Sequence, residues 1–371
     1  MAGALHNWVR GAFTAVGIPA AHAEQSAGQL VQTSLWGIDS HGVSRVPHYL
    51  NRLQRGSIKA RPKIGFDATG SATGNVEGDH GLGFVVCTFA ADKAIELARA
   101  GGAGIVGVRN SSHCGAIGLY SRRAAAQGLV GIAFTHSDSF VVPHGGNRAF
   151  FGTNPISIAI PTPDAARPLC LDMATSVVPM NRVMNARREN RAFPPGLAVD
   201  RDGRDTTDPH AIAALRPMAE HKGYAMAFVI DMLCGPLNGM PYGPHLNKMY
   251  DELDGHRRLG SLMIAFDPRR FFGGAGLAAA AFAAISEVKK QGGAVLYPGE
   301  PEYESEERRR REGIPMEPGL WRQIEEWSER LAVPLPVPLH PDGPARLKAR
   351  RRSGKNRAPG GRRSGNPSKD S

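Results

Sequence analysis

Cysteine is scarce in this 371-residue sequence, and long apolar runs are absent from it. The four cysteines, Cys87, Cys114, Cys170 and Cys234, lie far apart and form no C-x-x-C pair. This spacing excludes a zinc finger and favours reduced thiols over a disulfide framework. No apolar stretch reaches the roughly eighteen residues of a membrane span, and the first residues do not read as a secretory signal. We therefore expect a cytoplasmic protein with no membrane contact.

Positive charge is concentrated at one end of the chain. The net charge is +11, but residues 341–371 hold ten Lys/Arg against two Asp/Glu, a net of +8, which leaves +3 for the preceding 340 residues. Because residues 339–371 are poor in large apolar side chains, we expect a disordered basic tail. Association with nucleic acid through Arg350–Arg352 and Arg362–Arg363 is one alternative function. It is not favoured, because the preceding chain shows no recognised nucleic-acid-binding module.

Hydrophobic periodicity predicts both helices and strands. Apolar residues three and four apart predict helices over 4–16, 20–38, 46–55, 83–100, 222–235, 276–291 and 318–332. Short β-branched runs predict strands over 104–108, 131–135, 156–160, 169–172 and 262–266. A turn at Asp202–Gly203 precedes Thr206–Pro209, which we interpret as the capped start of another helix.

The segment Gly102-x-Gly104-x-x-Gly107 spells the dinucleotide-binding glycine pattern in the wrong context. Such a site needs a strand before the glycines and a helix after them, whereas here the predicted helix precedes and the predicted strand follows. We interpret these glycines as a helix C-cap and a turn. If a nicotinamide cofactor binds, we expect a fold other than the Rossmann fold.

Two histidines lie among small residues. His113 lies in Asn110–Tyr120, directly after the strand predicted around 105–108, and His41 lies in Asp39–Arg45. Imidazole is the side chain best suited to proton transfer near neutral pH. We predict that the two segments form one split active centre.

Six motifs occur in order along the chain: Ser40–Arg45, Asn110–His113, Gly152–Pro155, Leu171–Thr175, Lys222–Tyr224 and Tyr297–Glu300. Together they resemble the type-two malate/L-lactate dehydrogenase family, over about residues 4 to 335. Segments 127–143 and 249–260 are most similar to its ureidoglycolate dehydrogenase subgroup. The resemblance implies a non-Rossmann α+β fold with a largely antiparallel mixed sheet, and a homodimer or larger homo-oligomer.

The chain is longer than the roughly 250–300 residues that one core supports, so we expect more than one domain. The resemblance adds a helical module built from the N-terminus and the C-terminal helix. We place this module at 1–71, completed by about 300–338. Residues 72–299 are expected to form the NAD(P)-binding and catalytic α+β region, with room for two subdomains.

The resemblance assigns proton transfer to the two histidines. His113 matches the proton acceptor of ureidoglycolate dehydrogenase-like proteins, and a structural histidine bonded to a backbone carbonyl is the alternative. His41 resembles a proton donor in other members. The alternative for His41 is that Ser40 caps a helix and His41 shields that turn.

Four residues are expected to bind substrate. Arg45 offers two parallel donors to a carboxylate, although an ordinary solvated arginine is the alternative. Tyr49 lies one helical turn beyond Arg45 and could donate its hydroxyl, although core packing is the commoner fate of such a tyrosine. Asp138 is expected to orient His113 or bind the polar end of substrate, with a turn-forming aspartate as the alternative. Ser40 completes the set.

The resemblance also implies a cofactor site. Its residues are Ser137, Asp172, Met173, Ala174, Lys222, Gly299, Glu300 and Pro301. A surface lysine is the alternative for Lys222, and an ordinary turn is the alternative for Gly299. The cofactor is expected to be NAD or NADP, with NAD favoured.

The predicted activity is an NAD(P)-dependent dehydrogenase that interconverts a 2-hydroxy acid and a 2-oxo acid. Ureidoglycolate to oxalurate is the favoured reaction, and malate, lactate or sulfolactate are the alternative substrates. Hydride transfer needs no metal, and the sequence contains neither H-E-x-x-H nor a clustered Cys/His ligand set, so we expect no metal site.

Overall fold

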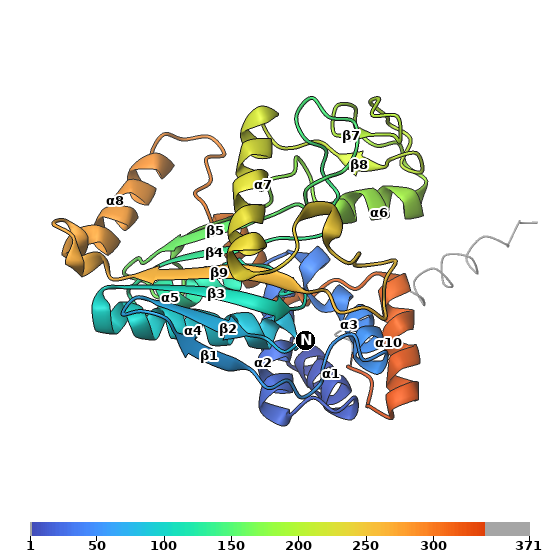
Figure 1. The fold of residues 1–371 in the computed structure, drawn as a ribbon, viewed down its shortest axis with the longest axis horizontal. Coiled ribbons are helices and arrows are strands. Elements are labelled where there is room, and N and C mark those ends of the chain that lie inside the picture. The colour runs from blue at the N-terminus through green and yellow to red at the C-terminus, as the bar shows by residue number, and fades with distance from the viewer. Residues whose placement is uncertain (1, 338–371) are drawn as a thin grey trace, which may run out of the picture.

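A computed structural model describes residues 2–337, and Figure 1 shows a central sheet with helices on both sides. The sheet has seven strands in the order β1-β2-β3-β9-β4-β5-β6. β2 and β3 are parallel, and the other neighbouring pairs are antiparallel. The chain is therefore α+β with a mixed, mostly antiparallel sheet. The strands are β1 (Gly65–Ala68), β2 (Thr73–Glu77), β3 (Ala103–Ser111), β4 (Val130–Thr135), β5 (Ile156–Ile160), β6 (Leu169–Met173) and β9 (Leu259–Phe266).

The two faces of the sheet carry different helices. α4 (Gly83–Gly101) packs on β3 and β9, and α5 (Gly118–Ala125) packs on β4 and β5. Their apolar sides form one core with the strands, which includes Val86, Ile95 and Val106. α7 (His221–Cys234) contacts β4 and β9 and lies on the opposite side of the sheet (Figure 1). The central strands β4 and β9 are thus covered by helices on both sides.

The glycine pattern at 102–107 serves the packing of α4 against the sheet. Gly102 ends α4 in the left-handed conformation with φ 95°. Gly104 lies within β3, where an added Cβ would come 2.1 Å from the carbonyl oxygen of Ala94 in α4. The predicted helix C-cap is confirmed, and the glycine at 104 permits the close approach of the helix to the strand.

A second core lies beneath the N-terminal helices. α1 (Ala2–Ala15), α2 (Ala20–Leu35), α3 (Val46–Gln54) and α10 (Pro318–Leu331) contribute to it together with the start of α4. Trp8 of α1 and Trp327 of α10 are among its buried side chains, and the Trp8 indole donates to Ser328 Oγ at 2.7 Å. Residues from the two ends of the described chain thus pack together around one core (Figure 1).

The helix predicted to begin at Thr206–Pro209 is not formed. Thr206 Oγ1 and Asp208 Oδ1 instead accept hydrogen bonds from backbone amides two residues further on, which closes local turns. The chain then enters β8 (Ala214–Leu215), which pairs with β7 (Ala198–Val199) in a separate two-stranded sheet. Side chains that cap helices also close such turns, and here the turn prevails.

Three further helices complete the described chain: α6 (Met180–Glu189), α8 (Leu277–Lys289) and α9 (Glu300–Glu312). None of the helices in residues 2–337 has the length and apolar character needed to cross a membrane. The tail predicted over 339–371 lies outside the described residues.

Candidate active site

The two histidine segments meet in the structure. Asp39–His41 and Val43–Arg45 form consecutive 3-10 turns between α2 and α3, whereas His113 lies in the loop between β3 and α5. The imidazoles of His41 and His113 stack with ring centroids 5.4 Å apart and planes inclined by 24°. Both rings are half-buried. The chain therefore brings together the two groups that the sequence analysis placed in one centre.

His113 lies in the loop Ser112–Ile117, which is held in place by contacts with the start of α4. The amide of Gly83 donates to Ser112 Oγ at 2.9 Å, and Ser112 Oγ donates to the carbonyl of Gly81 at 2.8 Å. Gly115 adopts φ +74°, and a Cβ there would lie 2.5 Å from the Phe84 ring. This conformation favours glycine, so the small residues around His113 follow from the loop's close contact with α4.

One nitrogen of His113 is engaged within the protein. Its Nδ1 lies 2.6 Å from the Tyr49 hydroxyl and 3.3 Å from the amide of Gly115. Tyr49 is fully buried in the N-terminal core, so its position is rigidly defined. Nε2 is therefore the nitrogen left for proton exchange with a substrate. It accepts a proton in the tautomer in which Nδ1 carries the ring hydrogen and donates it to the Tyr49 oxygen.

Ser40 and His41 interact with each other rather than cap a helix. Ser40 Oγ lies 2.8 Å from His41 Nδ1, and its carbonyl accepts a hydrogen bond from Arg45 Nε at 2.5 Å. No side-chain cap bond is found at this 3-10 turn. The capping alternative is therefore not what the structure shows, and the serine orients the imidazole.

Arg45 brings positive charge to the two imidazoles. Its Nη1 donates to the Tyr250 hydroxyl at 2.5 Å, and no carboxylate within residues 2–337 forms an ion pair with it. Burial and the nearby charge of Arg45 lower the pKa of His41 to about 3. Burial, followed by the charges of His41 and Arg45, holds the pKa of His113 well below its ordinary value. Both rings are thus neutral at neutral pH.

Asp138 does not orient His113. Its Oδ1 accepts a hydrogen bond from Arg257 Nη2 at 2.5 Å, and its Oδ2 accepts one from the amide of Met249 at 3.0 Å. The residue is only 3% exposed, and both of its oxygens are occupied. The expected contact with the imidazole is replaced by a buried ion pair that holds the segment before β9.

The contacts of Arg52 and Tyr250 in the site could not be predicted from local sequence patterns. Arg52, on α3, donates to the carbonyls of four residues in the segment before β9, namely Lys248, Met249, Glu252 and Gly255. This segment supplies Tyr250 to Arg45. Only its similarity to the ureidoglycolate dehydrogenase subgroup pointed to it, because contacts across about 200 residues leave no periodic pattern.

A buried His136–Asp231 pair also escaped the sequence analysis. The two side chains are fully buried, with His136 Nδ1 2.9 Å from Asp231 Oδ1. The amide of Gly260 donates to His136 Nε2, and the amide of Gly243 donates to Asp231 Oδ2. All of these atoms are satisfied internally, so the pair ties α7 to β4 and β9 without offering a free proton-transfer group.

The residues predicted to contact the cofactor are linked through backbone contacts. The Ser137 hydroxyl accepts a hydrogen bond from the amide of Thr153, whose carbonyl accepts one from the amide of Thr175. The carbonyl of Thr175 accepts from Met218, and the carbonyl of Met218 accepts from Gly223 at the start of α7. These hydrogen bonds link Ser137 and the segment after β6 to the start of α7, which carries the exposed Lys222.

Asp172 connects this group to the His113 loop. Its Oδ2 accepts a hydrogen bond at 2.8 Å from the amide of Gly118, the first residue of α5. Burial raises the pKa of Asp172 to about 6, against the lowering effect of the Gly118 hydrogen bond and of Arg122. The half-buried carboxyl can accept hydrogen bonds from hydroxyl groups such as those of a ribose.

The remaining predicted cofactor residues lie beside β6. Gly299 has φ +99° and packs against the backbone of Cys170, two residues before Asp172. The carboxylate of Glu300 is already engaged with Lys289 Nζ at 2.6 Å and with the amide of Tyr297. The combination of a half-buried carboxyl, a hydroxyl and an exposed lysine fits the ribose and phosphate groups of a nicotinamide dinucleotide.

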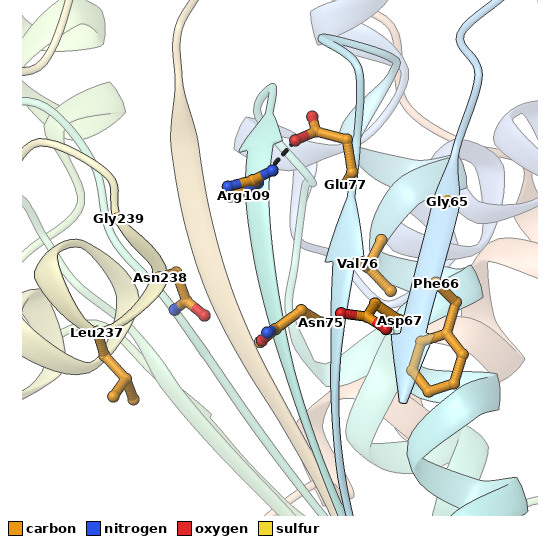
Figure 2. Close-up of a pocket in the computed structure, with 11 residues that line it drawn as sticks. Gly65, Phe66, Asp67, Asn75, Val76, Glu77, Arg109, Leu237, Asn238 and Gly239 are labelled. Carbon is orange, nitrogen blue, oxygen red and sulfur yellow. Dashed lines mark hydrogen bonds and ion pairs between the residues drawn. The ribbon is translucent and has the colours of Figure 1, made fainter. Parts of the chain in front are cut away.

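A separate groove of about 450 Å³ lies away from these residues, between β1, β2, β3 and Pro236–Asn238 (Figure 2). Figure 2 shows Asn75 and Asn238 facing each other and Arg109 paired with Glu77 at 2.7 Å. None of its lining residues belongs to the predicted site. Within residues 2–337, no cluster of three or more His, Cys, Asp or Glu side chains has the arrangement of a metal site.

Comparisons with known proteins give a consistent result. The sequence profile of the malate/L-lactate dehydrogenase family matches residues 2–325. Ureidoglycolate dehydrogenase (NAD(+)) from Escherichia coli O157:H7 is 37% identical over 267 residues, 72% of this chain and 76% of that protein. (2R)-3-sulfolactate dehydrogenase (NADP(+)) from Chromohalobacter salexigens is 36% identical over 265 residues, with coverage of 71% and 79%. The crystal structure of malate dehydrogenase from Entamoeba histolytica matches with a TM-score of 0.85 and 28% identity, over 91% of this chain and 98% of that chain.

Proposed function

This chain belongs to the malate/L-lactate dehydrogenase family, and within it we propose that the protein oxidises ureidoglycolate to oxalurate. The family places it among the nicotinamide-dependent oxidoreductases that act on 2-hydroxy acids. The observation that carries the proposal is the contact of Tyr49 with His113 Nδ1, beside the guanidinium of Arg45, which has no carboxylate partner within residues 2–337. This contact occupies Nδ1 of the neutral imidazole and leaves Nε2 for the substrate, next to the positive charge of Arg45.

His113 acts as the proton acceptor. Oxidation of a secondary alcohol removes a proton from the hydroxyl and a hydride from the same carbon. In this step Nδ1 carries the ring hydrogen and donates it to the Tyr49 oxygen, which leaves Nε2 unprotonated to accept the substrate proton without a turn of the ring. His41 stacks on this ring and, with Ser40, bounds its outer face.

Arg45 binds the substrate carboxylate. Its charge is not neutralised by any carboxylate in the described chain, and Ser40 and Tyr250 hold its orientation. A carboxylate bound there offsets the positive charge that lowers the pKa of His113. Substrate binding therefore raises the pKa of His113 and makes the imidazole a better base at the moment it is needed.

Ser137, Asp172–Ala174, Lys222 and Gly299–Pro301 bind the cofactor in this proposal. A bound nicotinamide ring supplies the hydride acceptor. Asp172 accepts hydrogen bonds from ribose hydroxyls, and Lys222 faces phosphate. We favour NAD over NADP, because a carboxyl at the ribose repels a 2′-phosphate. The glycine triplet at 102–107 has no part in binding, since it joins α4 to β3.

Malate, lactate and sulfolactate are the alternative substrates. They differ from ureidoglycolate only in the group attached to the hydroxyl-bearing carbon. The chemistry at His113 and Arg45 is the same for all of them, and the discrimination depends on the residues that contact this group.

A spectrophotometric screen tests the proposal. The purified protein is assayed with ureidoglycolate, malate, lactate and sulfolactate, each with NAD and with NADP, by following the reduced nicotinamide. We expect the highest kcat/KM for ureidoglycolate with NAD. A higher kcat/KM for another hydroxy acid would overturn the substrate assignment, and no reduction of either cofactor by any of the four would overturn the activity.

A further inference from the structure

Arg257 is buried with unused hydrogen-bond donors. Its side chain is 2% exposed, and Nη2 donates to Asp138 Oδ1 at 2.5 Å. Nε and Nη1 are also buried, and neither has a hydrogen-bond partner within residues 2–337. Buried N–H groups of a guanidinium are costly to leave unpaired, so these two atoms point to a missing acceptor.

Arg52 shows that the same region can satisfy a buried guanidinium completely. It is 1% exposed, and each of its three nitrogens donates within the protein, to His48, to Ser57 and to backbone carbonyls. The two arginines contact the same segment before β9, since Arg52 donates to the carbonyl of Met249 while the amide of Met249 donates to Asp138. The unpaired donors of Arg257 are thus not shared by the other buried guanidinium that contacts this segment.

Arg257 lies beside the proton-transfer groups. The amide of Met249 donates to Asp138, the ion-pair partner of Arg257, and the next residue, Tyr250, accepts from Arg45. The positive charge of Arg257 is also near enough to lower the pKa values of His113 and His48. The positive charges of Arg45, in the 3-10 turn before α3, and of Arg257, in the segment before β9, thus both act on His113.

The two guanidinium groups differ in charge balance. Arg45 has no carboxylate partner in the described chain, whereas Arg257 is neutralised by Asp138. An unpaired guanidinium favours a carboxylate. A guanidinium already paired with a carboxylate favours a neutral acceptor, because a second anion would be repelled by Asp138.

We propose that Arg257 is a second substrate-binding residue, which donates from Nε or Nη1 to a neutral carbonyl oxygen on the far side of the hydroxyl-bearing carbon. The inference rests on the proposed dehydrogenase function and sharpens it. It selects hydroxy acids that carry an amide-type or ureido carbonyl, and it disfavours lactate, whose methyl group leaves both donors unpaired. A site built around a hydrogen bond rejects an analogue that lacks the partner, because the buried donor then loses its acceptor.

The test compares two oxo acids that differ in the group on the far side of the reacting carbon from the carboxylate. Each is measured with wild type, Arg257→Lys and Arg258→Lys. Lysine keeps the positive charge beside Asp138 but lacks the planar donors, and Arg258 is an exposed neighbour that serves as the matched control. Binding of oxalurate and of pyruvate is measured by calorimetry with oxidised cofactor present, so that the oxo acids are not reduced, and thermal melting checks that each variant folds. We expect Arg257→Lys to weaken oxalurate about tenfold to a hundredfold and to change pyruvate less than about twofold.

The outcomes separate the two claims. The role of Arg257 would be overturned if folded Arg257→Lys bound oxalurate and pyruvate with equally reduced affinity, or bound oxalurate as tightly as wild type does. Either result would leave the dehydrogenase assignment in place. Unchanged oxalurate binding is the result expected if a buried water, and not the substrate, accepts the hydrogen bonds of Nε and Nη1. If Arg257→Lys does not fold, the wild-type preference for oxalurate over pyruvate decides the matter, and a preference under about tenfold overturns the inference. Wild type that neither binds nor turns over any hydroxy or oxo acid would overturn the proposed function itself.

Discussion

The Tyr49 hydroxyl lies 2.6 Å from Nδ1 of His113, and this contact joins α3 to the loop that follows β3. Tyr49 is held in the N-terminal core, whereas His113 is held by the sheet and by α4. The orientation of the imidazole therefore depends on the packing of the helical core against the sheet. Folding of both cores is needed before the site exists.

Replacing Tyr49 by phenylalanine should lower kcat about tenfold with little change in KM. The substitution removes one hydrogen bond to Nδ1, and such a bond contributes about 1 kcal/mol. Tyr120→Phe is the matched control, because its buried hydroxyl donates to the carbonyl of Cys114 in the same loop without touching the imidazole. It should lose similar stability by urea unfolding and much less kcat. Equal losses of kcat in both variants would mean that Tyr49 only supports the fold.

Replacing Arg45 by glutamine should raise KM for the hydroxy acid about tenfold to a hundredfold and lower kcat less. Glutamine retains polar character but loses the charge that binds the carboxylate, a contribution of about 1.5 to 3 kcal/mol. Steady-state kinetics measure the two constants separately. Arg55→Gln, directly after α3 in an exposed pair with Asp254, should leave both unchanged. A fall in kcat alone would exclude a role for Arg45 in binding substrate.

The pH profile of oxidation should have its acid limb below the ordinary histidine range. Burial, the adjacent His41 and the charges of Arg45 and Arg257 lower the pKa of His113 in the free protein. The base is neutral above that pKa, so kcat/KM falls only when the pH drops through the lowered value. Bound carboxylate raises this pKa, so the acid limb of kcat should lie at higher pH than that of kcat/KM. A kcat/KM limb at or above pH about 6.5 would contradict this account.

Replacing Arg52 by methionine should destabilise the protein by about 3 to 5 kcal/mol. The fully buried guanidinium gathers the carbonyls of the segment that carries Tyr250 and Arg257, and methionine leaves them without donors. Urea unfolding with Arg55→Met as the exposed control measures the difference. A loss equal to that of the control would show that the segment is held by other contacts.

Hydrophobic periodicity was sufficient to predict most of the sheet and the N-terminal helices. The β-branched runs at 104–108 and 156–160 lie in β3 and β5 of one sheet, and they contribute buried residues such as Val106, Val108 and Ala159. α9 was not predicted, because Glu300–Glu312 is charged on nearly every face. It is stabilised instead by pairs such as Glu306–Arg310 and by Arg309 with Asp39, which depend on side-chain spacing and tertiary contact.

The candidate site was predictable where chemistry follows local sequence. His41 and His113 were recognisable from their small neighbours, and the structure places their rings in contact. The roles of Asp138 and Arg257 were not recognisable, because a buried ion pair between residues 119 positions apart leaves no local pattern. An aspartate after a strand is equally compatible with a turn, a substrate contact or an internal ion pair, and only the tertiary structure selects the last.

The turnover of His113→Ala tests the central claim most directly. Single-turnover oxidation of the preferred hydroxy acid is measured for wild type and variant, with cofactor binding followed by fluorescence to show that the rest of the site is intact. Because His113 Nε2 is the proton acceptor in this account, the rate should fall about a hundredfold to ten-thousandfold while cofactor affinity is retained. A variant that kept the wild-type rate would show that another group accepts the proton.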